Sequence, residues 1–148
     1  MKPKVVFSNE AKSEMIWWTV NMLSFSGVHS DHSEPDFVLF TDASLTGWGC
    51  SCEISRTGGH WGYIEAQSNI IVLELKAALL ALHSIAREKA NIHVRLMMDN
   101  TTAIVCVAKM GTSQSVQCNA FTKEICQFCI TRSATFGCRQ HTYQAKQI

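Results

Sequence analysis

The sequence lacks a long apolar run, a secretory leader and an excess of charge of either sign. No stretch approaches the roughly 20 apolar residues of a membrane span. The apolar stretch after Met1-Lys2-Pro3-Lys4, Val5 to Phe7, is too short for a secretory core. A formal net charge of +1 gives no global basic field that would indicate a nucleic-acid partner, so any such contact would have to be local.

The composition is that of a folded domain. The chain has 148 residues, 47% of them hydrophobic and 17% charged, which predicts a single globular core and excludes wholesale disorder. Its seven cysteines are an odd number scattered along the chain, and without a leader they predict reduced thiols and an intracellular protein. Cys126 and Cys129 form a CxxC with no second pair, so packing within a helix is favoured over a zinc site.

The stretch FVLFTDASLTGWG, Phe37 to Gly49, organises the rest of the chain. The unbroken apolar run Phe37 to Phe40 predicts a strand buried on both faces. Asp42 follows directly, and a carboxylate there must be paired, bind a metal, or lie at a strand end that reaches into a cleft. Small and turn-prone residues then let the chain reverse.

The elements before and after this strand follow from periodicity and turn residues. Glu10 to Leu23 has a helical stripe with adjacent tryptophans, which favours docking, and residues 24–36 are typical of a linker. Trp48 to Ile54 alternates as a half-buried strand, and residues 56–59 contain the glycines of a hairpin turn. Residues 60–64 are expected to form a third strand, so three antiparallel strands lead the domain.

A helix is predicted from a cap at Ser68 or Asn69 to about Lys89, and it contains Glu74. The neighbours of Glu74 at helical spacing are apolar and small, so its carboxylate is expected to face packed protein; they are Ile70, Ala77, Ala78 and Ala81. The alternative is a glutamate that extends to solvent or pairs with Lys or Arg, and the pattern alone does not decide between the two.

Asp99 repeats the arrangement of Asp42, because it ends a strand predicted over residues 91–98 and precedes small polar residues. Its alternative role is the N-cap of a helix that begins near Thr101. If this fourth strand lies parallel to and beside the first, both aspartates share one sheet edge, and the crossing helix can bring Glu74 over it.

Buried carboxylates brought this close repel one another unless a cation is bound. Hard divalent ions, Mg²⁺ or Mn²⁺, take oxygen ligands and are the natural partners of such a cluster. Two such ions about 4 Å apart promote in-line hydrolysis of a phosphodiester. The sequence therefore predicts metal-assisted phosphodiester hydrolysis at Asp42, Glu74 and Asp99.

The motifs TDASLTGWG, VLELKAALLAL and MMDNTTAIV resemble the ribonuclease H domain of retrotransposon reverse transcriptases, with DIRS-like elements the most similar. The resemblance covers roughly Phe37 to Arg132. It implies an α/β fold with a ribonuclease H-like mixed sheet, three antiparallel strands and then a parallel fourth, with flanking helices. It also implies an endonuclease that cleaves the RNA strand of an RNA–DNA hybrid and that adjoins a polymerase domain.

The resemblance assigns roles to individual residues. Asp42 would bridge both ions, and Glu74 and Asp99 would complete the second. The residues expected to contact substrate are Ser44, Asn100, Thr101, Thr102, Ser113 and Ser115. No membrane partner is expected.

One departure from the family concerns the end of the chain, where the family continues with a fifth strand, an H-I-P-G-K-x-N segment and a helix that carries a fourth carboxylate. The tail from Ser133 to Ile148 has no such pattern, so the fifth strand and last helix are expected to be missing. No Asp or Glu follows Glu124, so hydrolysis is expected to be weak or absent. Ser133 to Cys138 is expected to pair with the fourth strand only imperfectly. Codons for Gln140 to Ile148 permit A-H-I-P-G-K-T-N in a shifted frame, which suggests a frameshift.

The expected organisation is a polymerase-connecting helix and linker over residues 1–35, a ribonuclease H-like domain over 36–132 and an aberrant tail over 133–148. Two other classes remain open. One is a non-catalytic module of the same fold that binds hybrid nucleic acid or a polymerase. The other is an integrase or transposase, which the order Asp-Glu-Asp disfavours.

Overall fold

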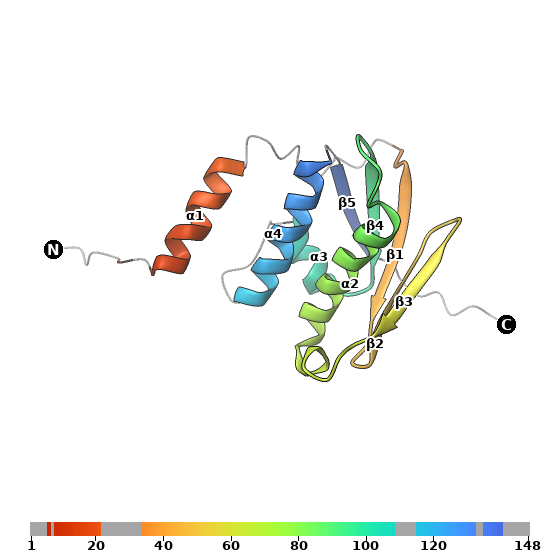
Figure 1. Ribbon diagram of the computed structural model, residues 1–148, viewed down its shortest axis with the longest axis horizontal. Helices are drawn as coiled ribbons and strands as arrows, with labels where there is room; N and C mark the ends of the chain where they lie inside the picture. The colour runs from red at the N-terminus through yellow and green to blue at the C-terminus, as the bar shows by residue number, and fades with distance from the viewer. Residues whose placement is uncertain (1–5, 7, 22–33, 109–114, 133–134, 141–148) are drawn as a thin grey trace.

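Figure 1 shows the computed structural model of the chain, which describes residues 6, 8–21, 34–108, 115–132 and 135–140. The helices are α1 (Asn9–Asn21), the short 3-10 helix η1 (Glu65–Gln67), α2 (Ile70–Ile85), α3 (Thr101–Ala108) and α4 (Val116–Thr131). The strands are β1 (Phe37–Ala43), β2 (Gly47–Ser51), β3 (Arg56–His60), β4 (His93–Met98) and β5 (Thr135–Gln140).

The strands form one mixed sheet in the order β3-β2-β1-β4-β5. Strands β1, β2 and β3 are antiparallel neighbours, and β4 lies parallel to β1, with Phe37 opposite Val94 and Phe40 opposite Met97. The predicted antiparallel trio and the parallel fourth strand are therefore confirmed. This order brings the ends of β1 and β4 to the same edge of the sheet.

The prediction of a missing fifth strand is wrong. Strand β5 pairs in parallel with β4 along its full length, from Thr135 opposite His93 to Gln140 opposite Met98. The physical reason is that β4 would otherwise expose a row of unpaired backbone groups, which any extended segment within reach can satisfy. The sheet thus continues beyond residue 132, where the domain was expected to end. The expected last helix concerns residues after Gln140, which lie outside the described residues.

The predicted hairpin turn at residues 56–59 and third strand at 60–64 are also misplaced. The turn lies at Cys52 to Ser55, whose backbone groups bond to each other, and the glycines fall inside β3. Gly58 is required there for close backbone approach, because a Cβ atom would lie 2.6 Å from the carbonyl oxygen of Trp48. Glycines in a strand were mistaken for glycines in a turn.

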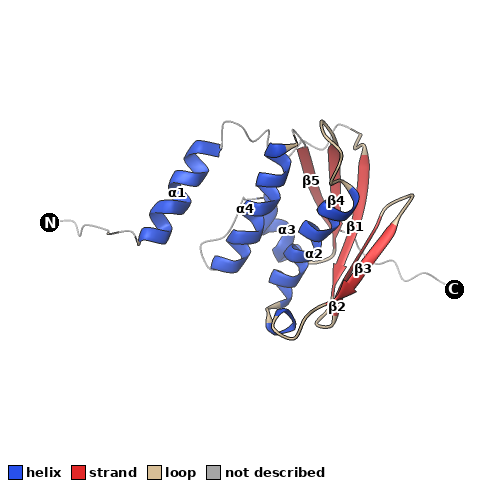
Figure 2. Cartoon of the chain, in the orientation of Figure 1, coloured by secondary structure: helices blue, strands red, loops and turns tan. Residues whose placement is uncertain are grey.

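The helices α2, α3 and α4 cover one face of the sheet (Figure 2). The core under them contains Leu39, Leu96 and Met98, which are fully buried. Burial alternates along β4, and in β1 Phe40 is 38% exposed, so the prediction that Phe37 to Phe40 is buried on both faces is wrong. The apolar run reflects a strand with one packed face and one open face.

The helix predicted over Glu10 to Leu23 is present as α1, and the Lys123 ammonium lies 4.8 Å from the centroid of the Trp17 ring, which joins α4 to α1. Residues 22–33, most of the predicted linker, lie outside the described residues. Among the described residues, no helix has the length and apolar character of a membrane span. Cys126 and Cys129 are buried in α4, as helix packing predicts.

Candidate metal centre

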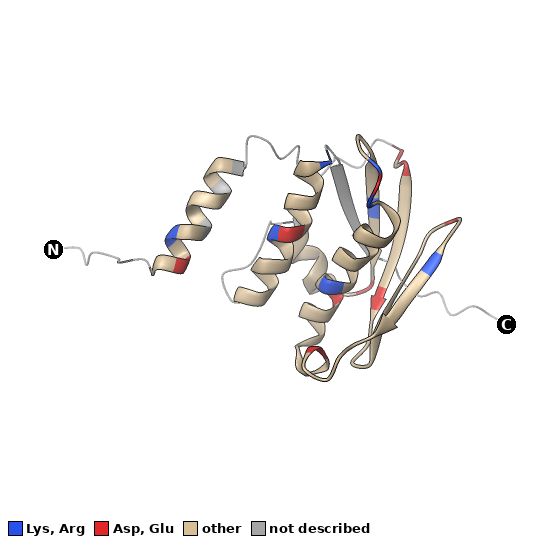
Figure 3. Cartoon of the chain, viewed as in Figure 1, with Lys and Arg blue, Asp and Glu red and all other residues tan. Residues whose placement is uncertain are grey.

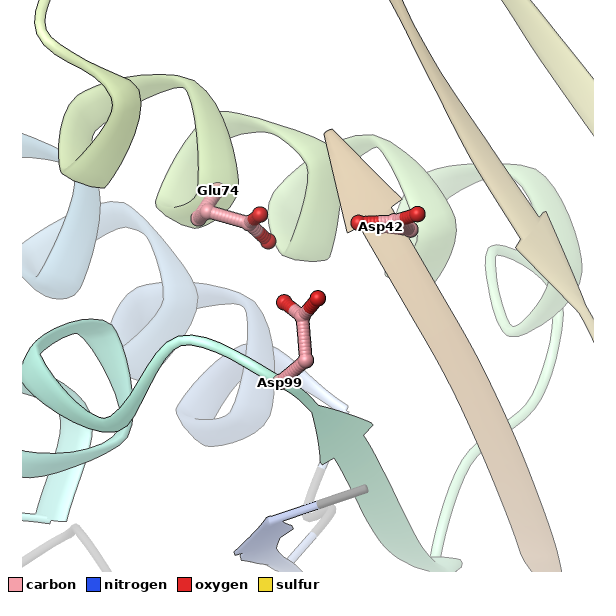
Figure 4. Close-up of side chains that lie close together, drawn as sticks. All are labelled: Asp42, Glu74 and Asp99. Atoms are coloured by element: carbon pink, nitrogen blue, oxygen red, sulfur yellow. The ribbon is translucent and has the colours of Figure 1, made fainter. Parts of the chain in front are cut away.

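Three carboxylates from separate elements meet at one end of the sheet (Figure 4). Asp42 lies near the end of β1, Asp99 directly follows β4, and Glu74 projects from α2 toward both. One oxygen from each side chain lies within 4.8 Å of the others. The parallel pairing of β1 with β4 places the two aspartates side by side, and α2, which packs on β1, supplies the glutamate.

Glu74 is the buried member of the cluster, with 3% of its surface exposed. Burial, followed by the charges of Asp99 and Asp42, raises the pKa of Glu74 to about 7, while the backbone N–H of Ala43 lowers it. Its Oε2 atom has no hydrogen-bond partner within the described part of the chain. The alternative of a solvated or lysine-paired glutamate is wrong, because Lys76 pairs with Glu65 instead.

Small residues allow this burial. Ala77, Ala78 and Ala81 are fully buried on α2, so the helix lies close to the sheet and its glutamate reaches the strand ends. The helix begins at the predicted cap, since the Asn69 side chain accepts a hydrogen bond from the N–H of Ile71. The cap and the small stripe together fix the position of Glu74.

Asp99 is not the N-cap of α3. The Asn100 side-chain oxygen accepts a hydrogen bond of 2.9 Å from the N–H of Ala103 and so caps that helix. The Asp99 carboxylate is thereby left to face Glu74 and Asp42. The N-cap of α3 is therefore Asn100, one residue after the aspartate considered for that role. Asn100, expected to contact substrate, thus also has a structural role.

The other expected substrate contacts occupy different places. The Ser44 hydroxyl accepts from the N–H groups of Thr46 and Gly47 in the turn after Asp42. Thr101 and Thr102 are exposed in the first turn of α3. The Ser115 hydroxyl accepts from the N–H of Cys118 and caps α4. Ser113 lies outside the described residues.

Trp61 supports the centre and was not predicted. Its indole N–H donates a 2.8 Å hydrogen bond to the carbonyl oxygen of Ser44, in the turn that follows Asp42. The ring is 8% exposed and packs with Leu73 and Ala77 on α2, next to Glu74. One side chain thus ties the turn after β1 to the helix that carries the glutamate. A tryptophan between glycines and turn residues gave no periodic signal.

We expect Trp61→Phe to lower the free energy of unfolding by about 1–3 kcal/mol, because the part-buried hydrogen bond to the Ser44 carbonyl oxygen and some buried ring volume are lost. Urea unfolding measures this change. Trp17→Phe on α1 is the matched control, since Trp17 is only partly buried. An equal effect at both positions would contradict a specific role for Trp61.

The cluster fits a hard divalent cation. The donor set consists of carboxylate oxygens only, which Mg²⁺ and Mn²⁺ prefer over nitrogen or sulfur ligands. The partnerless Oε2 atom of buried Glu74 is the kind of group that a cation satisfies. A cation would also relieve the repulsion among Asp42, Glu74 and Asp99.

No family model matches the sequence, and no curated protein sequence matches it. RNase H1 from the halophilic archaeon Halobacterium salinarum NRC-1 is similar in structure, with a TM-score of 0.60 at 11% identity over 72% of this chain and 86% of that one. LC11-RNase H1 in complex with an RNA/DNA hybrid gives a TM-score of 0.60 at 12% identity, over 76% and 89% of the two chains.

A second structure of LC11-RNase H1, isolated from compost, gives a TM-score of 0.52 at 14% identity, over 73% of this chain and 86% of that one. At such low sequence identity, similarity of the backbone establishes only the fold, and function must be inferred from the site itself. The chain therefore has a ribonuclease H-like fold, with the sheet and flanking helices that the motifs predicted.

Proposed function

We propose that this chain acts on RNA–DNA hybrids as a ribonuclease H-type nuclease, with Mg²⁺ or Mn²⁺ held by Asp42, Glu74 and Asp99. The observation that carries the proposal is the convergence of three carboxylates within 4.8 Å at the ends of adjacent parallel strands. The substrate class is supported by the similar LC11-RNase H1, whose structure was determined with an RNA/DNA hybrid.

Each carboxylate has a distinct part in this scheme. Asp42, at the exposed strand tip, would hold the ions from the β1 side, and Asp99 and buried Glu74 would hold them from β4 and α2. Bound ions of this kind supply an activated water and charge stabilisation for the leaving oxygen. The protein keeps the ligands in place beforehand, because α2 fixes Glu74 and the Asn100 cap fixes the start of α3. Ion binding requires Glu74 to be ionised and should therefore release protons near neutral pH.

The motifs further support derivation from a retroelement reverse transcriptase with DIRS-like relatives. In that setting α1 and the segment up to residue 35 would connect this domain to a polymerase domain, inside the cell. The Trp17–Lys123 contact, which joins α1 to α4, is compatible with such a connection. The continuation of the sheet through β5 extends the proposed domain to at least Gln140.

A second candidate is a module that binds hybrids or a polymerase without cleavage. It is favoured by a specific observation, since the described residues bring together three carboxylates where the family resemblance implies four. The two candidates share a fold and differ in turnover, because the nuclease cleaves the hybrid whereas the module binds a hybrid or a polymerase without cleavage.

The deciding experiment incubates the full chain with an end-labelled RNA–DNA hybrid in Mg²⁺. The nuclease proposal expects cleavage of the RNA strand that EDTA stops, while single-stranded RNA and duplex DNA stay intact. Hybrid binding without cleavage in either Mg²⁺ or Mn²⁺ would favour the binding module. A chain that neither binds nor cleaves the hybrid would overturn both the nuclease and the hybrid-binding module.

A further inference from the structure

An open groove of about 800 Å³ lies on the sheet beside the three carboxylates. Asp42 and Asp99 line it together with Arg56 and His60 of β3, so the acidic side chains share one concave surface with a guanidinium and an imidazole. No residue of α2, α3 or α4 is among its lining residues, which places it on the face that those helices leave uncovered. We call this surface the β2–β3 groove.

The register of the strands arranges the groove in rows. Asp42 lies opposite Gly49 of β2, while Arg56 lies opposite Ser51 and His60 opposite Gly47. Arg56 and His60 therefore stand on either side of the row that begins at Asp42. Strands lie about 4.8 Å apart, so this row extends roughly 10 Å from β1 to β3. At roughly 3.4 Å of helix axis per nucleotide, that length accommodates about three nucleotides of one strand.

Glycine lowers the floor of the groove. Gly47 and Gly49 of β2 and Gly59 of β3 are among the lining residues. A Cβ atom at Gly49 would meet only the carbonyl oxygen of Thr57, at 3.9 Å, so packing within the protein does not require a glycine there. A glycine in a strand normally weakens the strand unless it allows close approach of another group. At Gly49 the space above the backbone is open to a ligand.

The groove has one formal positive charge, that of Arg56, and a hydrogen-bonding imidazole at His60. Among the described residues, Lys and Arg are spread over separate elements, including α1, α2, α4, β3 and β4 (Figure 3). Within the described part of the chain, no carboxylate pairs with Arg56 or His60, and both are exposed. A phosphate chain that extends from the metal centre along the groove would therefore reach these two side chains.

We propose that the β2–β3 groove holds the sugar-phosphate backbone of the strand that is cut, next to the phosphate at the metal centre. The inference rests on the proposed hybrid substrate and adds where that strand runs. Gly49 supplies clearance for the backbone, and Arg56 and His60 contact its phosphates from either side. Phosphate contacts of this kind position a strand without reading its sequence.

The test compares two variants with one control in the full chain. Arg56→Gln removes a groove charge, and Gly49→Val fills the floor with a β-branched side chain that suits a strand. Arg87→Gln is the matched control, because Arg87 is exposed in the turn after α2 and is not a groove residue. Hybrid binding is measured by fluorescence anisotropy in Ca²⁺ over a range of salt concentrations, and unfolding by urea.

Arg56→Gln is expected to weaken binding roughly 5- to 10-fold and to lower the salt dependence by about one phosphate contact. Gly49→Val is expected to weaken binding about tenfold or more through a steric clash, with no loss of stability and with unchanged stabilisation by Mg²⁺. Arg87→Gln is expected to bind like the wild type.

The groove proposal would be overturned if both groove variants bound hybrid as tightly as Arg87→Gln. It would also be overturned if the wild type bound no hybrid. If the wild type cleaves hybrid while the variants bind normally, the nuclease stands and the groove fails. If binding depends on Arg56 and Gly49 but no cleavage occurs, the groove stands and the nuclease fails.

Discussion

Asp42→Asn is expected to abolish Mg²⁺-dependent cleavage of an RNA–DNA hybrid. The amide keeps the shape of the side chain but removes the charge that would hold both ions, at a position within 4.8 Å of Glu74 and Asp99. Loss of a direct ligand should cost more than the roughly 10- to 100-fold that follows from altering a group that only supports a ligand. The measurement is single-turnover cleavage of end-labelled hybrid, compared with the wild type.

Asp36→Asn is the matched control for this change. Asp36 lies just before β1, at the opposite end of the strand from Asp42, where its carboxylate accepts a 2.7 Å hydrogen bond from the N–H of His93. An asparagine oxygen can accept the same bond, so cleavage should stay close to the wild-type rate. If Asp42→Asn cleaves as fast as Asp36→Asn, Asp42 does not hold the ions and the observed activity belongs elsewhere.

The candidate centre could be predicted because each of its residues follows a strong local signal. Asp42 and Asp99 end apolar strands, and Glu74 interrupts a stripe of buried small residues on a long helix. Burial patterns of this kind are set by the side chains themselves. The order of the strands then follows from the rules for short, right-handed connections, which leave few arrangements for β1 and β4.

The errors arose where backbone contacts outweigh side-chain patterning. Strand β5 forms because the edge of β4 requires a partner, and its sequence TFGCRQ carries no clear alternation. Gly58 was assigned to a turn although it serves a close backbone contact inside β3. Trp61 and the β2–β3 groove depend on residues that meet only after the sheet has formed, so no local pattern could indicate them.

Without metal, the protein is expected to lose stability as the pH rises from about 4.5 to 7. The pKa of Glu74 is raised from 4.5 to about 7, so the folded state binds a proton that the unfolded state has released in this range. The contribution of Glu74 to stability is therefore fully present below 4.5 and is lost above about 7. Its size is on the order of 2–3 kcal/mol. Urea unfolding in EDTA at pH 5 and pH 8 measures it.

Glu74→Gln tests the cause of this pH dependence. The amide stays neutral at every pH, and its oxygen can still accept the hydrogen bond from the N–H of Ala43. In EDTA at pH 8 the variant should be more stable than the wild type, by on the order of 2–3 kcal/mol. Mg²⁺ should stabilise the wild type at pH 8 and not the variant, because a ligand that binds only the folded state adds stability.

Glu65→Gln is the control for the substitution itself. The hydrogen bond from Lys76 lowers the pKa of Glu65, so this carboxylate stays ionised from pH 5 to pH 8 and its loss should leave the pH dependence unchanged. A wild-type stability in EDTA that is flat or rises between pH 5 and pH 8 would contradict the burial of Glu74 beside two like charges. If stability falls with pH and Mg²⁺ restores it, the folded protein holds uncompensated negative charge at Asp42, Glu74 and Asp99, which a cation neutralises.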